Sequence, residues 1–80
     1  QVTVYPDFTI RHPKTGKVFI WEHLGTMGDP TYRRNALSKL QLYMEHGWIP
    51  SVNLILTFET KEYPLDMAYV EGLIKEYFVK

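Results

Sequence analysis

Two short segments near the N-terminus, 5–10 and 18–25, contain many β-branched and aromatic residues. Residues of these types favour β-strands. Between the segments lies Pro13-Lys14-Thr15-Gly16, where proline and glycine favour a tight reversal of the chain. The pattern therefore predicts an antiparallel β-hairpin. The weak alternation over 1–4 predicts an edge strand or the tail of one.

The rest of the chain alternates between helical and strand patterns. Asp29-Pro30 suits the N-cap and first position of a helix, and Gly47 suits its end, which predicts a helix over 30–46. The nearly continuous apolar run in 51–58 is typical of a strand that is covered on both faces and paired in parallel. A second helix is expected from 65 or 66 to 78.

Helical spacing selects the side chains that are expected to face the sheet. In the first helix they are Ala36, Leu37, Leu40, Tyr43 and Met44. In the second helix they are Met67, Val70, Leu73, Ile74 and Tyr77. We therefore expect a single α/β domain over 1–80, with a small mixed sheet built from a β-hairpin, a helix, a parallel strand and a helix.

The composition suits a globular protein, since 45% of the residues are hydrophobic and 15% are aromatic. No run of about 18 apolar residues occurs, so no membrane span is expected. The absence of cysteine excludes disulfides and thiolate metal sites and favours a cytoplasmic location. Because the chain starts at Gln1 within a strand-like segment, we expect it to be part of a longer protein with further domains.

The net charge of zero argues against a protein that binds nucleic acid through bulk electrostatics. The charges are nevertheless unevenly distributed. Residues 1–43 hold six basic and three acidic side chains, whereas residues 44–80 hold three basic and six acidic ones. The basic half could serve contacts with phosphate, although chance explains such a distribution equally well in a short chain.

The expected hairpin brings two carboxylates together. If a four-residue loop joins the strands, residue 12 faces residue 17, and Asp7 then faces Glu22. Directly opposed side chains share one face of the sheet, with Cβ atoms about 4.5–5.5 Å apart. Two close carboxylates repel each other and require a cation or a shared proton, and Mg²⁺ is the natural partner. A three-residue loop with a bulge would shift this register by one residue.

A family resemblance follows from these residues. Pro6-Asp7, a glutamate fifteen residues later on the next strand, a helix with an inward lysine and then a buried strand resemble the PD-(D/E)xK nuclease superfamily, the restriction-endonuclease-like fold. The resemblance covers most of 4–58. It includes Trp21-Glu22-His23-Leu24-Gly25, followed by Tyr32, Lys39 and Tyr43.

The chain departs from the family pattern at two points. Leu24 stands where the family has its lysine, two residues after the acidic residue, and no room remains for the usual first helix before Val2. Some members of the superfamily supply the lysine from the following helix. Lys39 is the candidate here, since it shares a helix face with Tyr43 and borders the apolar stripe.

The resemblance implies a specific set of roles. Asp7, Glu22 and the backbone carbonyl of His23 would hold Mg²⁺, or Mn²⁺ in its place, and Lys39 would orient or deprotonate the attacking water. The substrate would be DNA, with the phosphodiester bond hydrolysed. The expected contacts with DNA are made by Lys17, Arg33, Arg34 and Tyr43.

Other interpretations remain open at this point. Glu22 could form a salt bridge with Lys17 or Arg11, and Lys39 could be an ordinary solvated residue. The same fold could bind nucleic acid without cleaving it, or serve as a homodimerising module. The last alternative draws on aromatic side chains that a small domain could leave uncovered: Trp21, Trp48, Phe58, Tyr63 and Phe78.

Overall fold

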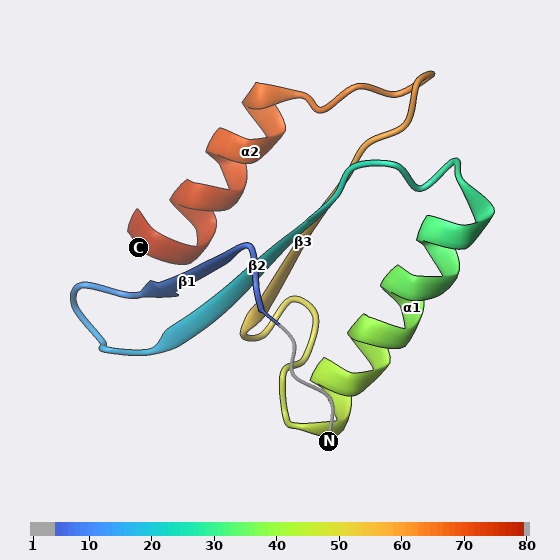
Figure 1. Cartoon of the computed structure of the whole chain (residues 1–80). Coiled ribbons are helices and arrows are strands. Elements are labelled where there is room, and N and C mark those ends of the chain that lie inside the picture. The colour runs from blue at the N-terminus through green and yellow to red at the C-terminus, as the bar shows by residue number, and fades with distance from the viewer. Residues whose placement is uncertain (1–4, 80) are drawn as a thin grey trace.

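The computed structural model describes residues 5–79, so the strand expected over 1–4 lies outside the described residues. The elements are β1 (Phe8–Arg11), β2 (Val18–Leu24), α1 (Pro30–Glu45), β3 (Leu54–Phe58) and α2 (Met67–Ile74), which continues into a π-helical turn, Lys75–Val79. The helices lie on opposite faces of the sheet (Figure 1). This arrangement confirms a small mixed α/β fold.

The strand order is β1-β2-β3, with β1 antiparallel and β3 parallel to β2. The ladder from Phe8↔Trp21 to Arg11↔Val18 has the register predicted from a four-residue loop. Gly16 closes that loop at φ 74°, a conformation that glycine adopts without strain. β1 is shorter than expected and begins just after Asp7, because Pro6 has no N–H to donate to a ladder.

The ends of α1 follow from its sequence. The Asp29 side chain accepts hydrogen bonds from the N–H groups of Thr31 and Tyr32, which caps the first turn. The helix ends at Glu45, and Gly47 follows at φ 89°. The third strand begins only at Leu54, because residues 51–53 form a turn instead of the predicted start of the strand.

Alternating residues of β2 divide the core between the two faces of the sheet. Ile20 and Leu24 pack with Ala36, Leu40 and Tyr43 of α1. On the other face, Phe19, Trp21 and Ile55 pack against α2 and the turn that follows it. Of the described residues, none belongs to a helix that is long and apolar enough to cross a membrane.

The prediction of helix burial is wrong at four positions. Leu37 and Met44 of α1 are 56% and 44% exposed, and Met67 and Ile74 of α2 are 63% and 42% exposed. These side chains flank the residues of each helix that pack on the sheet, and the three strands leave them uncovered.

Candidate active site

Asp7, Glu22 and Lys39, the three residues that the sequence singled out for catalysis, line one open cavity of about 190 Å³. The hairpin supplies the two acidic residues and α1 supplies the lysine. Tyr32, Asn35 and Ala36 of α1, with His23 and Leu24 of β2, complete the lining. The cavity therefore lies on the α1 face of the sheet, beside the point where β1 begins.

Glu22 is almost completely buried, with 2% of its surface exposed. Its Oε1 accepts a hydrogen bond of 2.6 Å from the Tyr43 hydroxyl, and Lys39 Nζ lies 3.1 Å from Oε1 and 3.3 Å from Oε2. A buried carboxylate is costly unless it is both hydrogen-bonded and paired with a cation. Both conditions are met here, and the cation is Lys39 rather than Lys17 or Arg11.

Tyr43 is the buried hydrogen-bond donor to Glu22. Its side chain is 4% exposed, and its hydroxyl is engaged by the carboxylate. Burial, the hydrogen bond to Glu22 and the negative charges of Glu22 and Asp7 all raise the pKa of Tyr43. The hydroxyl thus stays protonated and donates. This burial argues against the expected contact of Tyr43 with DNA, since only 4% of the residue is exposed.

Lys39 joins α1 to the start of the hairpin. Besides Glu22, its ammonium group donates to the backbone carbonyl of Tyr5 at 3.1 Å. It also lies 5.8 Å from the centroid of the Tyr43 ring. With 31% of its side chain exposed, Lys39 runs along the apolar edge and presents its charged end to the cavity. It is not an ordinary solvated helix residue.

Asp7 is exposed, and its position depends on the neighbouring strand. Its Oδ2 accepts a hydrogen bond of 2.8 Å from the backbone N–H of His23. Within residues 5–79, no donor is found for its Oδ1. Asp7 therefore offers one oxygen to the cavity, and the peptide next to Glu22 holds the other.

The His23 ring lies on the opposite face from Glu22, as strand alternation predicts. Its Nδ1 is 2.8 Å from Thr57 Oγ1, and its Nε2 is 3.0 Å from Glu59 Oε1. Trp21 Nε1–H also donates to the Thr57 hydroxyl, at 3.2 Å. These contacts fix the ring, and thereby the backbone segment whose N–H binds Asp7.

The sequence reasoning missed both Thr57 and Glu59. The pairing His23↔Thr57 arises from the parallel register of β2 and β3. Hydrogen bonds from the His23 ring and from the Leu65 N–H lower the pKa of Glu59. The polar residues at the end of the apolar run in 54–58 could have indicated that this strand end makes polar contacts.

The other basic residues expected to contact DNA lie outside the cavity. Arg33 and Arg34 are exposed on α1, and Arg33 donates to the Met27 carbonyl at 2.8 Å. Lys17 lies over the Phe19 ring, on the α2 side of the sheet, with its ammonium 5.1 Å from the ring centroid. Lys17 and the cavity thus lie on different faces.

The donors at the cavity that could hold a cation are carboxylate oxygens. Among the described residues, no group of three or more His, Cys, Asp or Glu side chains is placed to hold a metal ion. The cavity offers two carboxylates instead. Mg²⁺ is usually held by one or two carboxylates while it keeps several waters, whereas zinc needs three or four nitrogen, sulfur or oxygen ligands.

No family model, no curated protein and no solved structure matches this chain.

Proposed function

We propose that this chain is a Mg²⁺-dependent nuclease domain that hydrolyses phosphodiester bonds in DNA. The observation that supports this most strongly is the meeting of Asp7, Glu22 and Lys39 at one cavity, with Lys39 Nζ 3.1 Å from Glu22 Oε1. The family resemblance implies two carboxylates and a lysine, and Lys39 of α1 would take the place of the lysine that Leu24 replaces. The hairpin supplies the two carboxylates and α1 supplies the lysine, so the meeting of Lys39 with Glu22 is a property of the fold.

Asp7, Glu22 and the backbone carbonyl of His23 would hold the metal ion. When bound, Mg²⁺ would stabilise negative charge on the phosphate and make a water molecule more acidic. Mn²⁺ could replace it, because it favours similar oxygen ligands.

Three groups of the protein itself have separate roles in this proposal. Lys39 orients the attacking water through its ammonium hydrogens and offsets the charge that develops on the phosphate. Tyr43 holds the Glu22 carboxylate at a fixed rotamer through the 2.6 Å hydrogen bond. The His23 N–H holds one oxygen of Asp7, a residue that lines the cavity, and leaves the other oxygen available for the metal ion.

DNA would be positioned by charge on the same helix that carries the lysine. Arg33 and Arg34 are exposed at the N-terminal end of α1. Contacts of arginine with backbone phosphates fix the register of a protein on DNA without reading its sequence. Because the net charge of the chain is zero, this local charge is the source of affinity that we propose.

The test is cleavage of plasmid and of single-stranded DNA by the purified chain, with Mg²⁺, with Mn²⁺ and with a chelator. Asp7→Asn and Glu22→Gln remove one charge each and preserve shape. We expect each to reduce the metal-dependent rate by about a hundred- to a thousand-fold, the size of effect found when a group that stabilises the transition state is lost.

Glu62→Gln is the matched control, because Glu62 is an exposed glutamate that does not line the cavity. It should cleave at the wild-type rate. Cleavage that persists in both Asp7→Asn and Glu22→Gln would refute the site. Binding of DNA without any metal-dependent cleavage would instead support the non-catalytic alternative on the same fold.

A further inference from the structure

The two edges of the sheet differ in how they are protected. The β1 edge is only four residues long, includes Arg11, and is flanked by Pro6 and Pro13. The β3 edge, Leu54–Phe58, has neither a charged residue nor a proline. Proteins normally protect a free strand edge with short length, charge or proline, because its unpaired N–H and C=O groups recruit another strand. Among the described residues, Pro50 bridges to Leu54 at the start of β3, and the rest of this edge carries neither charge nor proline.

The backbone groups that face outward on β3 follow from its pairing with β2. The Asn53 carbonyl accepts from the Ile20 N–H at 2.9 Å, and the Glu59 N–H donates to the Leu24 carbonyl at 3.0 Å. Odd-numbered residues thus direct their backbone groups towards β2, and even-numbered ones direct theirs outward.

One of the outward-facing residues is already satisfied. Leu54 donates to the Ile49 carbonyl and accepts from the Ser51 N–H, each at 3.1 Å. Within residues 5–79, no partner is found for the outward N–H and C=O groups of Leu56 and Phe58. These two residues offer an adjacent set of donors and acceptors to another strand.

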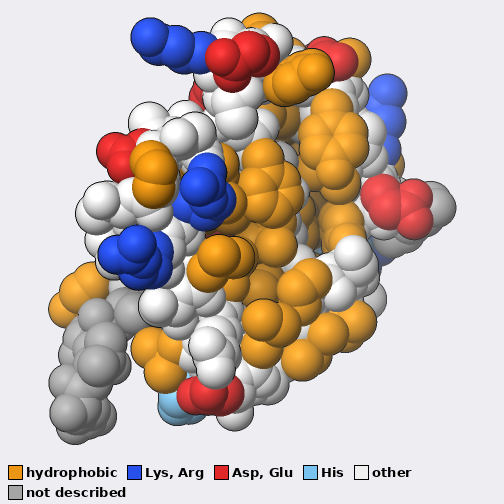
Figure 2. Space-filling view, turned by 90° about the vertical axis from the view of Figure 1, so that its right-hand side faces the viewer, with side chains coloured by type: hydrophobic (Ala, Val, Ile, Leu, Met, Phe, Trp, Pro, Cys, Tyr) orange, Lys and Arg blue, Asp and Glu red, His pale blue; other side chains and the backbone are white. Residues whose placement is uncertain are grey.

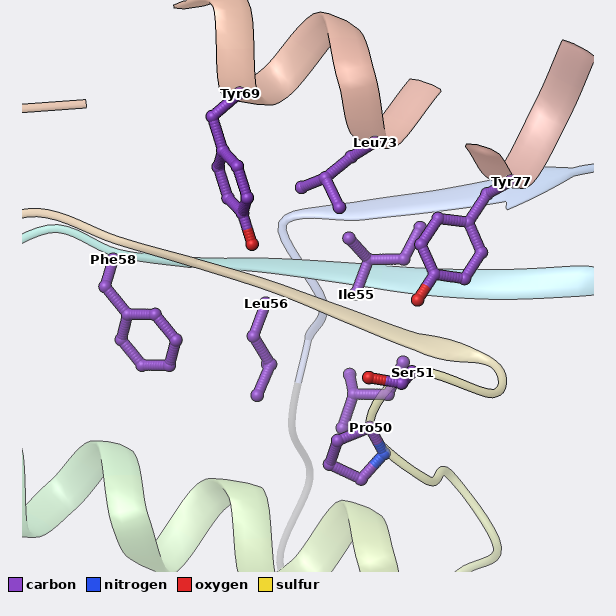
Figure 3. Close-up of a pocket in the computed structure, with 9 residues that line it drawn as sticks. Pro50, Ser51, Ile55, Leu56, Phe58, Tyr69, Leu73 and Tyr77 are labelled. Carbon is purple, nitrogen blue, oxygen red and sulfur yellow. The ribbon is translucent and has the colours of Figure 1, made fainter. Parts of the chain in front are cut away.

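The surroundings of this edge are apolar. A cavity of about 220 Å³ lies between β3 and α2, and none of the described residues that line it is charged. Tyr69, Leu73 and Tyr77 project from the helical side towards the sheet (Figure 3). Phe58 and Tyr69 are 51% and 55% exposed. On this side of the molecule, hydrophobic side chains cover the middle and right of the view, with Lys and Arg side chains beside them on the left (Figure 2).

The neighbouring flank of α1 is also apolar. Lys39 reaches from one flank of α1 to Tyr5 and Glu22, on the β1 side of the sheet. Leu37 and Met44, seven residues apart, share the opposite flank, and so they lie towards the β3 edge. Their helical spacing predicts burial, yet a single copy leaves them exposed.

We propose that the chain forms a two-fold homodimer in which β3 pairs antiparallel with β3 of a second copy. If Thr57 lies on the two-fold axis, Leu56 of each copy faces Phe58 of the other. Both residues have free outward groups, so each such pair exchanges two hydrogen bonds. The strand is thus complementary to itself, as a two-fold interface requires.

A second copy suits this edge in two further respects. Because the net charge is zero, two copies do not repel each other through their overall charge. The resulting six-stranded sheet ends at a protected β1 edge on each side, so assembly stops at two copies. The two-fold axis places both α1 helices on one face, where Leu37 and Met44 of the two copies approach each other. This inference is independent of the proposed nuclease activity.

Sedimentation equilibrium over a range of concentrations tests the proposal. The wild-type chain should behave as a dimer at micromolar concentration. Phe58→Lys places a charge at the centre of the interface and should weaken association by about a hundred-fold or more, as loss of a central aromatic contact does. Phe8→Lys is the matched control, because Phe8 is 60% exposed on the opposite edge, and it should remain a dimer.

Hydrogen exchange of the Leu56 amide separates strand pairing from any other contact. The amide should be protected in the wild type and should exchange freely in Phe58→Lys, while the circular dichroism of both proteins stays the same. A wild-type chain that is monomeric at several hundred micromolar, a dimer that survives Phe58→Lys, growth beyond two copies, or an unprotected Leu56 amide would each overturn the proposal.

Discussion

The two faces of the sheet each carry a glutamate with a basic partner, but the two pairs differ in their environment. On the α1 face, the Glu22 side chain is 3% exposed and contacts Lys39 and Tyr43. On the α2 face, the Glu59 side chain is 38% exposed and contacts His23. Water can replace the partner of Glu59 but not that of Glu22. The buried Glu22 carboxylate therefore needs both Lys39 and Tyr43 as partners. These two residues hold it in one position, as a functional site requires.

The largest effect on stability is expected from Lys39→Met. It leaves the buried Glu22 charge without a cation, and we expect the free energy of unfolding to fall by about 2 kcal/mol. This is less than for a fully buried pair, because the Lys39 side chain is 31% exposed. Urea denaturation measures the change, with the exposed Arg34→Met as control.

A double variant sharpens the same test. In Glu22→Gln/Lys39→Met no charge remains at the buried position, so much of the lost stability should return. If Lys39→Met were as stable as the wild type, the pairing of Lys39 with Glu22 would have no energetic importance.

A smaller effect, with a characteristic pH dependence, is expected from Tyr43→Phe. At neutral pH, loss of the hydrogen bond to Glu22 should reduce the free energy of unfolding by about 1–2 kcal/mol. Because the folded pKa of Tyr43 is raised, its stabilising contribution is complete below pH 10 and is lost as the pH rises further. The difference between wild type and Tyr43→Phe should therefore shrink above pH 10.

The measurement is urea denaturation at pH 8 and at pH 11, with Tyr63→Phe as control, since Tyr63 is 78% exposed. A difference between wild type and Tyr43→Phe that is equal at both pH values would contradict the raised pKa.

The smallest effect is expected from Glu59→Gln on the other face. The folded pKa of Glu59 is lowered, so its contribution is present above its ordinary pKa of 4.5 and is lost as the pH falls through the lowered value. Thermal unfolding should show a slight destabilisation of Glu59→Gln at pH 6 that disappears at strongly acidic pH. A loss as large as that of Lys39→Met would mean that the two faces do not differ as described.

The sequence predicts the local parts of this fold well. Proline and glycine set the length of the hairpin loop, and the loop length fixes the register that brings Asp7 beside Glu22. Asp29 and Gly47 likewise fix the ends of α1 within a residue of those predicted. In each case the decisive residues are close together in the chain, so turn and capping chemistry is sufficient.

Features that depend on distant segments could not be predicted in the same way. No short loop sets the register between β2 and β3, so the contacts of His23 with Thr57 and Glu59 were missed. Helical spacing shows that Tyr43 faces the sheet, but not that its hydroxyl meets Glu22. The width of the sheet, which leaves Leu37 exposed, also has no local signal.

The most direct test of the central claim is a titration of the purified chain with Mn²⁺, followed by the loss of the free-ion electron paramagnetic resonance signal. The account predicts that one ion binds, that Asp7→Asn and Glu22→Gln each weaken its binding at least ten-fold, and that Glu59→Gln binds it with wild-type affinity. No binding at millimolar Mn²⁺, or binding that Glu22→Gln leaves unchanged, would contradict the claim that Asp7 and Glu22 form a metal site.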